Sequence, residues 1–144
     1  MEVKQYMSKK VKTCEDNDSV AFATKKMAEF NIGSIIVIKD GKPIGIFTER
    51  DLVRRVVALD KNPANVLIGE VMTKKLITID AEESVGVAYH IFTELNVRHA
   101  PVVKNNELVG IISQKDLAKV LDSRFYGTYL GKNRYAPKDL SGKY

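Results

Sequence analysis

The chain has 144 residues, of which 44% are hydrophobic and 28% are charged, with a single cysteine and no tryptophan. This composition is typical of a globular protein and excludes a disordered, collagen-like or disulfide-stapled chain. The longest unbroken aliphatic run, Ile35 to Ile38, is far shorter than the roughly 18 residues that a membrane span needs. We therefore predict no membrane partner. Because the first residues lack the apolar stretch of a secretory signal, we expect a cytoplasmic location.

The net charge of +5 is concentrated at one end of the chain. Residues 124–144 contain five basic side chains and one acidic side chain, whereas residues 1–123 are close to neutral. Aromatic residues are interleaved with the basic ones, a composition able to stack bases and contact phosphates. Nucleic-acid binding through residues 124–144 is therefore one hypothesis. The competing interpretation is a tail that packs on its own module or on a second copy, or that is flexible.

The sequence contains an internal repeat with an offset of 65 residues. Residues 7–52 align with residues 72–117 without a gap, and 15 of the 46 aligned pairs are identical. Self-similarity of this extent indicates duplication of a structural unit. Each copy predicts the order strand, helix, strand, strand, helix.

The first two elements of each copy are a short strand and an amphipathic helix. The strand contains Cys14 in one copy and Ile79 in the other, so we expect the Cys14 thiol to be buried and not to act as a nucleophile. Ser19 and Ser84 stand where helix N-caps belong. The apolar stripe of the helix is Val20, Ala23, Met27 and Phe30 in the first copy, and Val85, Ala88, Phe92 and Leu95 in the second.

Two strands and a closing helix complete each copy. Residues 34–38 form an apolar run without polar alternation, which predicts a strand buried on both faces, and residues 100–103 are its counterpart. Asp40-Gly41 and Asn105-Asn106 tolerate positive φ, which predicts tight hairpin turns. The return strands, 44–47 and 109–112, lead into helices from Glu49 to about Leu59 and from Gln114 to about Leu121.

Each copy is shorter than about 60 residues, which is too small to bury a sufficient core by itself. We therefore expect the copies to pack as a pseudo-two-fold pair with a cleft between them. The predicted fold class is α/β (α+β), with two β-α-β-β-α repeats at residues 3–59 and 68–123. The predicted linker is 60–67, and the basic, tyrosine-containing C-terminal tail is 124–144.

The strongest local motif has glycine, a hydroxyl residue and aspartate at spacings of three, where a return strand meets a closing helix. It runs from Gly45 to Asp51 and again from Gly110 to Asp116. One interpretation is a capping box, in which hydroxyl and carboxylate satisfy free amide groups of the helix. The other is nucleotide binding: the helix start attracts phosphate, the carboxylate accepts ribose hydroxyls, and glycine admits a ligand close to the backbone. Both interpretations can hold at once.

The repeat and this motif together resemble a tandem of CBS domains, named after cystathionine β-synthase, also called a Bateman module. The resemblance covers about residues 3–121. It implies a regulatory module, not an enzyme, that binds AMP, ADP, ATP or S-adenosylmethionine between its repeats. It also implies a homodimer and a regulated partner protein, which the sequence does not name.

The resemblance further implies two composite nucleotide sites, each built from both repeats. The site with Asp51 would comprise Ile46, Thr48, Arg50, Asp51, Thr73, Lys75, Leu76, Ile77, Val97, Arg98 and His99. The site with Asp116 would comprise Ser8, Lys10, Val11, Ile32, Gly33, Ser34, Ile111, Ser113, Lys115 and Asp116. Because Gly33 and Ser34 are the counterparts of Arg98 and His99, we expect the Asp51 site to bind the more anionic nucleotide more tightly.

Catalytic chemistry is not predicted. Two histidines and one cysteine at unrelated positions give no metal-ligand spacing, and His90 is expected at the surface. The sequence contains no nucleophile–base pair and no hydride-cofactor fingerprint. We therefore predict no catalytic residue, no metal site and no catalytic cofactor.

Overall fold

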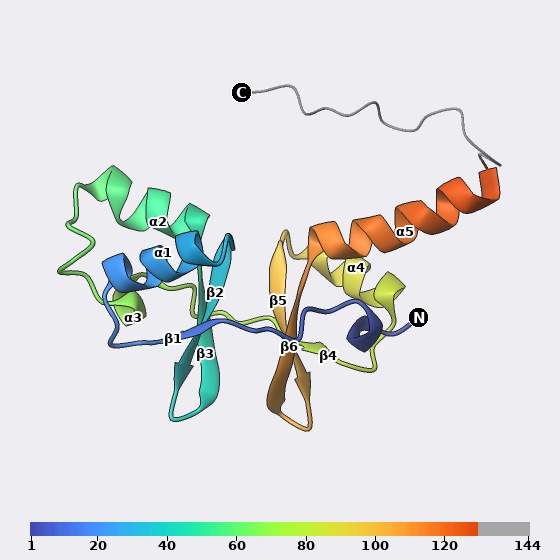
Figure 1. Ribbon diagram of the computed structural model, residues 1–144, viewed down its shortest axis with the longest axis horizontal. Helices are drawn as coiled ribbons and strands as arrows, with labels where there is room; N and C mark the ends of the chain where they lie inside the picture. Colours follow the sequence, from blue (N-terminus) through green and yellow to red (C-terminus); the bar gives the residue numbers. More distant parts are fainter. Residues whose placement is uncertain (130–144) are drawn as a thin grey trace.

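The computed structural model describes the backbone of residues 1–129 and the side chains of residues 1–122. Two three-stranded sheets stand side by side, one in each half of the molecule (Figure 1). The longer helices gather at one side of the molecule, and the tips of the two hairpins lie at the opposite side. The predicted α/β class with two repeats is confirmed.

The two halves have the same topology. In each half a central strand pairs in parallel with the first strand and in antiparallel with the third. The first repeat contains β1 (Thr13–Glu15), α1 (Val20–Glu29), β2 (Ser34–Lys39), β3 (Lys42–Thr48), α2 (Glu49–Arg55) and the 3-10 helix η2 (Val57–Leu59). The second contains α3 (Ile68–Val71), β4 (Ile79–Asp80), α4 (Val85–Glu94), β5 (His99–Lys104), β6 (Glu107–Ser113) and α5 (Gln114–Tyr129), and the chain opens with η1 (Val3–Gln5).

Local hydrogen bonds set the element boundaries. The side chain of Ser19 accepts the Phe22 amide N–H at 3.0 Å and that of Ser84 accepts the Val87 amide at 3.1 Å, so both predicted N-caps are confirmed. The hairpin residues Asp40, Gly41, Asn105 and Asn106 all have positive φ, as predicted.

Two features of the helices differ from the sequence prediction. Phe30 and Leu95 do not complete the buried stripes, because α1 and α4 end one residue earlier and leave them 41% and 51% exposed. The closing helices are unequal: α2 stops at Arg55, whereas α5 continues past Leu121 to Tyr129. Residues 124–129 of the predicted tail therefore continue a helix, and the predicted nucleic-acid contacts of the tail lie outside the described side chains.

The two halves of the folded molecule do not coincide with the two repeats of the sequence. Val3 of η1 is fully buried in the core of the second half, where its amide donates to the Glu83 carbonyl at 2.9 Å. Ile68 of α3 is fully buried in the core of the first half and donates to the Asp18 carbonyl at 2.9 Å. Figure 1 shows η1 beside α4 and α3 beneath α1. Each half therefore completes its core with a segment of the other repeat.

The chain crosses between the halves along two segments, residues 8–12 and 73–78, which we call the crossing segments. Thr73 exchanges two backbone hydrogen bonds with Ile46 of β3, at 2.8 and 3.1 Å. Ser8 makes the equivalent exchange with Ile111 of β6, at 2.9 and 3.0 Å. These pairings place both crossing segments between the two sheets.

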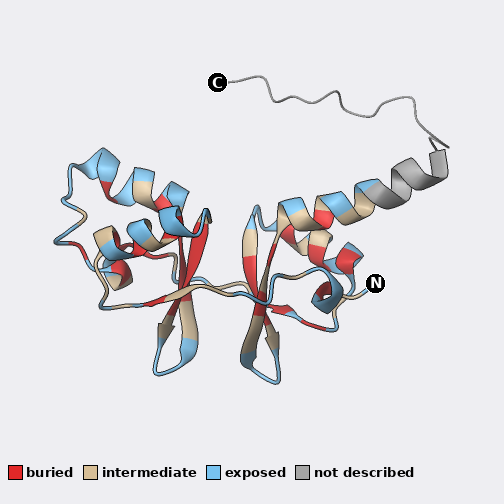
Figure 2. Ribbon diagram, viewed as in Figure 1, coloured by how far each residue is buried: buried red, intermediate tan, exposed pale blue. Residues whose placement is uncertain are grey.

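Alternation along the strands decides which side chains face the space between the halves. Phe47 of β3 and Ile112 of β6 are fully buried, each in the core of its own half. Figure 2 shows the buried segments of both sheets in red. Because successive side chains of a strand point to opposite faces, the neighbours of Phe47 face the other half.

No helix among residues 1–129 is both long and apolar enough to cross a membrane.

Candidate functional site

Two cavities lie between the halves. Cavity 1 has a volume of about 240 Å³ and is lined by β3, the start of α2, the second crossing segment and the turn into β5. Cavity 2 has a volume of about 320 Å³ and is lined by the first crossing segment, the turn into β2 and β6. Each cavity thus takes its walls from both repeats, as the composite sites require.

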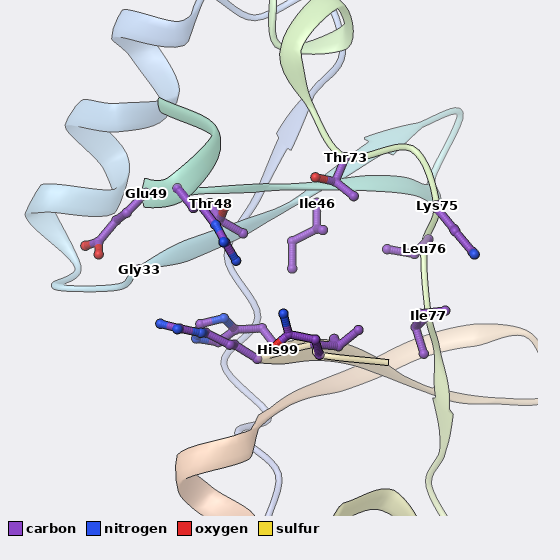
Figure 3. Close-up of a pocket in the computed structure, with 13 residues that line it drawn as sticks. Gly33, Ile46, Thr48, Glu49, Thr73, Lys75, Leu76, Ile77 and His99 are labelled. Atoms are coloured by element: carbon purple, nitrogen blue, oxygen red, sulfur yellow. The ribbon is translucent and has the colours of Figure 1, made fainter. Parts of the chain in front are cut away.

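Cavity 1 brings together every residue predicted for the Asp51 site except Asp51 itself. Figure 3 shows Thr48, Ile46 and Thr73 along one wall, facing His99 and Ile77 on the other. The predicted residues that line it are Ile46, Thr48, Arg50, Thr73, Lys75, Leu76, Ile77, Val97, Arg98 and His99.

Asp51 lies behind this wall and is only 7% exposed. One carboxylate oxygen, Oδ2, accepts the Thr48 amide N–H at 3.0 Å, and the Thr48 hydroxyl accepts the Asp51 amide at 3.2 Å. The Thr73 hydroxyl also donates to the carboxylate, at 3.1 Å from Oδ1 and 3.2 Å from Oδ2. The capping-box interpretation is therefore confirmed, and a role for Asp51 as a ribose ligand stays a prediction.

Cavity 2 brings together most of the residues predicted for the Asp116 site. Val11 does not line it, and Lys115 lines an adjoining open depression together with Arg98 and His99. Ser113 and Asp116 form the second capping box, with both hydrogen bonds at 3.0 Å. The predicted residues that line cavity 2 are Ser8, Lys10, Ile32, Gly33, Ser34, Ile111, Ser113 and Asp116.

The structure adds lining residues that the motif did not indicate. Asn96 lines cavity 1 and Asn31 lines cavity 2, at the turns where α1 and α4 end. Their φ values of 51° and 52° are in the left-handed region, which asparagine tolerates. This pair is identical in the repeat alignment, which is the signal that could have found it. The other added residues are Gly33 and Glu49 in cavity 1, and Lys12, His99 and Ile112 in cavity 2.

The two cavities differ in charge. Cavity 1 is lined by three cationic side chains and one carboxylate: Arg50, Lys75 and Arg98 with Glu49. Cavity 2 is lined by Lys10, Lys12 and the Asp116 carboxylate. The Lys12 ammonium also stands 4.0 Å from the centre of the Phe30 ring, a cation–π contact. Cavity 1 is therefore the more positive of the two.

His99 belongs to the lining of both cavities. Burial is the main reason why the pKa of His99 lies below its ordinary value, and the nearby Arg98 charge adds to this effect. The carboxylates of Asp116 and Glu49 oppose the shift. At neutral pH the ring is thus uncharged and offers a hydrogen-bond donor and an acceptor, but no positive charge, to a ligand.

The lowered pKa of His99 predicts a loss of stability in mild acid. The unfolded chain binds a proton at the ordinary value, near 6.5, whereas the folded protein binds it only at lower pH. The stabilisation from the uncharged His99 ring is therefore complete above the pKa of the unfolded chain. It is lost as the pH falls from there to the lower pKa of the folded protein. We expect the free energy of unfolding, measured in urea at pH 7.5 and 5.5, to fall more for the wild type than for His99→Gln. An equal fall in both proteins would contradict the assignment.

Gly45 and Gly110 do not open the backbone to a ligand, so that prediction is wrong. A Cβ atom at Gly45 would lie 2.6 Å from the Met72 sulfur and 2.9 Å from the Thr73 carbonyl oxygen. One at Gly110 would lie 2.5 Å from the Met7 sulfur and 2.9 Å from the Ser8 carbonyl oxygen. The space beside each glycine is filled by the protein itself, and glycine is needed so that a crossing segment can pack against β3 or β6.

The remaining reactive side chains are placed as predicted. Cys14 is buried, and burial raises the pKa of its thiol to about 12, so the thiolate nucleophile is scarce at neutral pH. His90 is exposed on α4. Among the described residues, no group of three or more histidine, cysteine, aspartate or glutamate side chains is arranged to hold a metal ion.

The CBS-domain family model matches residues 3–58 and 68–123. The chain belongs to the CBS-domain family. CBS pairs are, in general, regulatory modules. Protein YlbB of Bacillus subtilis is 36% identical over 118 residues, which cover 81% of this chain and 79% of YlbB. The mitochondrial CBS-domain protein CBSX3 of Arabidopsis thaliana is 33% identical over 75% of this chain, which spans only 55% of the Arabidopsis protein.

Solved CBS-pair structures share the fold. A CBS-domain protein from Burkholderia ambifaria superposes with a TM-score of 0.82 at 29% identity, covering 94% of this chain and 99% of its own. The CBS pair of protein MJ0100, solved with 5′-methylthioadenosine and S-adenosylmethionine, has a TM-score of 0.78 at 28% identity, covering 86% of this chain and 98% of its own. A hexameric CBS-CP12 protein from bloom-forming cyanobacteria has a TM-score of 0.77 at 31% identity, covering 82% and 66%.

Proposed function

We propose that this CBS pair is a regulatory module that binds adenosine-containing ligands in cavities 1 and 2 and signals their presence to a partner protein. The observation that carries the proposal is the pair of composite cavities, each walled by both halves and lined by cations, hydroxyl groups and aliphatic side chains. The complex of MJ0100 with two adenosine compounds supports this ligand class for a protein of the same fold. The candidates are AMP, ADP, ATP and S-adenosylmethionine.

The lining of cavity 1 suits the parts of a nucleotide. Ile46 and Ile77 face each other across the cavity and offer apolar surface to the two faces of a base (Figure 3). Arg50 and Arg98 offer charged N–H donors to phosphate oxygens, and such charge-assisted hydrogen bonds are stronger than neutral ones. We propose that base and phosphate are recognised by different elements of the two repeats. Ligand binding would then depend on how the halves are placed relative to each other.

Signalling would follow from the fact that both halves of the molecule line each cavity. A ligand shifts an equilibrium between two arrangements only if it binds one of them more tightly. Because β3 and β6 belong to different halves and each contributes to a different cavity, a ligand in either cavity favours the arrangement that best encloses it. The partner protein would recognise that arrangement. We propose no reaction for the module itself.

The charge difference between the cavities supports tighter binding of the more anionic nucleotide in cavity 1. We expect Arg98→Ala to weaken ATP binding in cavity 1 by about tenfold, because it removes charge-assisted hydrogen bonds to phosphate. Asp116→Ala should leave this affinity unchanged. Isothermal titration of both variants with ATP measures the difference, and equal losses from the two substitutions would contradict the asymmetry.

The proposed function is tested most directly on protein purified without added nucleotide. Mass spectrometry of the denatured sample should identify an adenosine compound, or titration with AMP, ADP, ATP and S-adenosylmethionine should show saturable binding at or below millimolar concentration. If no adenosine compound copurifies or binds in this range, the proposed function is wrong.

We further propose a homodimer formed through the helical side of the molecule. Apolar side chains are exposed at pseudo-equivalent positions of the two repeats: Phe22 and Val87 are 53% and 45% exposed, and Phe30 and Leu95 show the same pattern. A two-fold pairing of copies would cover these residues, and a mass from sedimentation equilibrium distinguishes it from a monomer or a hexamer. The cytoplasmic location stays a prediction from the sequence.

A further inference from the structure

The carboxylates of the two motifs are held in different ways. Asp51 receives the Thr73 hydroxyl on both oxygens, at 3.1 and 3.2 Å, besides the Thr48 amide at 3.0 Å. The Arg55 guanidinium lies 3.8 Å from Oδ1. Arg55 is itself held in place, because it donates to the carbonyl oxygens of Val71 and Met72 at 3.2 and 2.9 Å. Asp51 is thus buried and surrounded by donors of the protein.

The second motif has the same backbone but lacks these partners. Ser8 pairs with Ile111 as Thr73 pairs with Ile46, so Ser8 and Thr73 are structural equivalents. Among the residues whose side chains are described, however, the Asp116 carboxylate accepts a single hydrogen bond, from the Ser113 amide at 3.0 Å. Val120 occupies the position of Arg55 and carries no charge. Asp116 lines cavity 2, whereas Asp51 does not line cavity 1.

The donors already bound to each carboxylate, and the side from which they approach it, decide what the carboxylate can offer a ligand. An ionised carboxylate has about four lone-pair positions. At Asp51 the Thr48 amide and the shared Thr73 hydroxyl engage both oxygens, and Thr73 itself lies in the cavity wall in front of them. A ribose diol would have to displace this hydroxyl. At Asp116 one oxygen accepts no hydrogen bond from the described residues and the group faces the cavity.

We propose that Thr73 withholds Asp51 from cavity 1, so that cavity 1 binds nucleotides through base and phosphate without selecting for the ribose 2′-hydroxyl, whereas cavity 2 requires it. This inference rests on the proposed function and assigns the ribose selectivity of the module to Asp116. The cations Arg50, Lys75 and Arg98 supply the phosphate recognition that cavity 1 needs. Thr73 acts here as a positioning residue.

The two cavities can be followed separately by NMR, with the δ1 methyl groups of Ile77 in cavity 1 and Ile111 in cavity 2 as reporters. The full chain is titrated with AMP and with 2′-deoxy-AMP. At Ile111 we expect 2′-deoxy-AMP to bind about tenfold more weakly or worse, because a hydrogen bond to a charged group is lost. At Ile77 the two dissociation constants should agree within about twofold.

Substitution of Thr73 completes the test. Thr73→Val keeps the shape of the side chain and removes the hydroxyl, so Asp51 becomes available and Ile77 should then report about tenfold discrimination. Thr78→Val is the matched control, because it makes the same change in the same crossing segment at an exposed residue that lines neither cavity, and it should change neither ratio. The amide spectrum of each variant verifies the fold, and Thr73→Ala is a second variant with the same expected result.

The outcomes separate this inference from the proposed function. Tenfold discrimination at Ile77 in the wild type, or an unchanged ratio there in folded Thr73→Val, overturns the role of Thr73 while nucleotide binding stands. Methyl shifts at neither reporter with either nucleotide at millimolar concentration overturn the proposed function and this inference together.

Discussion

Val3→Asp is expected to lower the free energy of unfolding by about 3 kcal/mol or more, a large part of the stability of an ordinary domain. Val3 is fully buried in the core of the second half, beside Ile79 and Phe92. The substitution removes an apolar side chain from this core and places a carboxyl group there without a partner. Urea denaturation followed by circular dichroism measures the loss.

Val57→Asp is the matched control, because the same change is made at a side chain of η2 that is 59% exposed and belongs to neither core. Substitution at such an exposed position should change the free energy of unfolding by less than about 0.5 kcal/mol. A similar, small effect of both substitutions would show that the N-terminal residues do not complete the core of the second half in solution.

Gly45→Ala is expected to lower the free energy of unfolding by about 1–3 kcal/mol, the usual cost of overpacking a filled space. The added methyl group would lie 2.9 Å from the Thr73 carbonyl oxygen, which is backbone and cannot rotate away. Moving this oxygen disturbs the pairing of Thr73 with Ile46, and both residues line cavity 1. Nucleotide affinity in cavity 1 should therefore fall as well, while cavity 2 is unaffected.

Gly86→Ala provides the control for Gly45→Ala. Gly86 lies in α4, and a Cβ atom there would meet no atom within 4 Å. Because alanine favours a helix over glycine, this variant should be stabilised by up to about 1 kcal/mol. Thermal unfolding of both variants shows the contrast. A Gly45→Ala protein as stable as the wild type would contradict the close packing of the crossing segment on β3.

Much of the fold could be predicted because its signals are local. The hydroxyl of Ser19 reaches an amide three residues ahead, and the same spacing places Thr48 and Asp51 in a capping box. Asp40 and Asn105 adopt the positive φ of a hairpin turn by their own preference. Because the two copies align without a gap, each local prediction made for one copy also applies to the other. The lining of the two cavities followed from the family resemblance, which relates the motif to residues of the other repeat.

The structural features that the sequence did not predict depend on the path that the chain takes through the folded molecule. Nothing in the local sequence indicates that Val3 packs in the second half and Ile68 in the first, since burial there depends on crossing segments that exchange sides. The sequence motif predicts that Gly45 leaves space for a ligand beside the backbone, but the Met72 side chain of the other repeat fills this space.

The sequence by itself determined the duplication, the order and caps of the elements, and the residue types available to two sites. Only the tertiary structure decided which of those residues face a cavity. Asp51 and Asp116 are identical in the alignment, yet Thr73 and Arg55 bury one while the other stays open to cavity 2. The physical reason is that the hydrogen bonds within each motif span three residues, whereas the Thr73 hydroxyl reaches Asp51 across 22 residues, through contacts that only the folded chain creates.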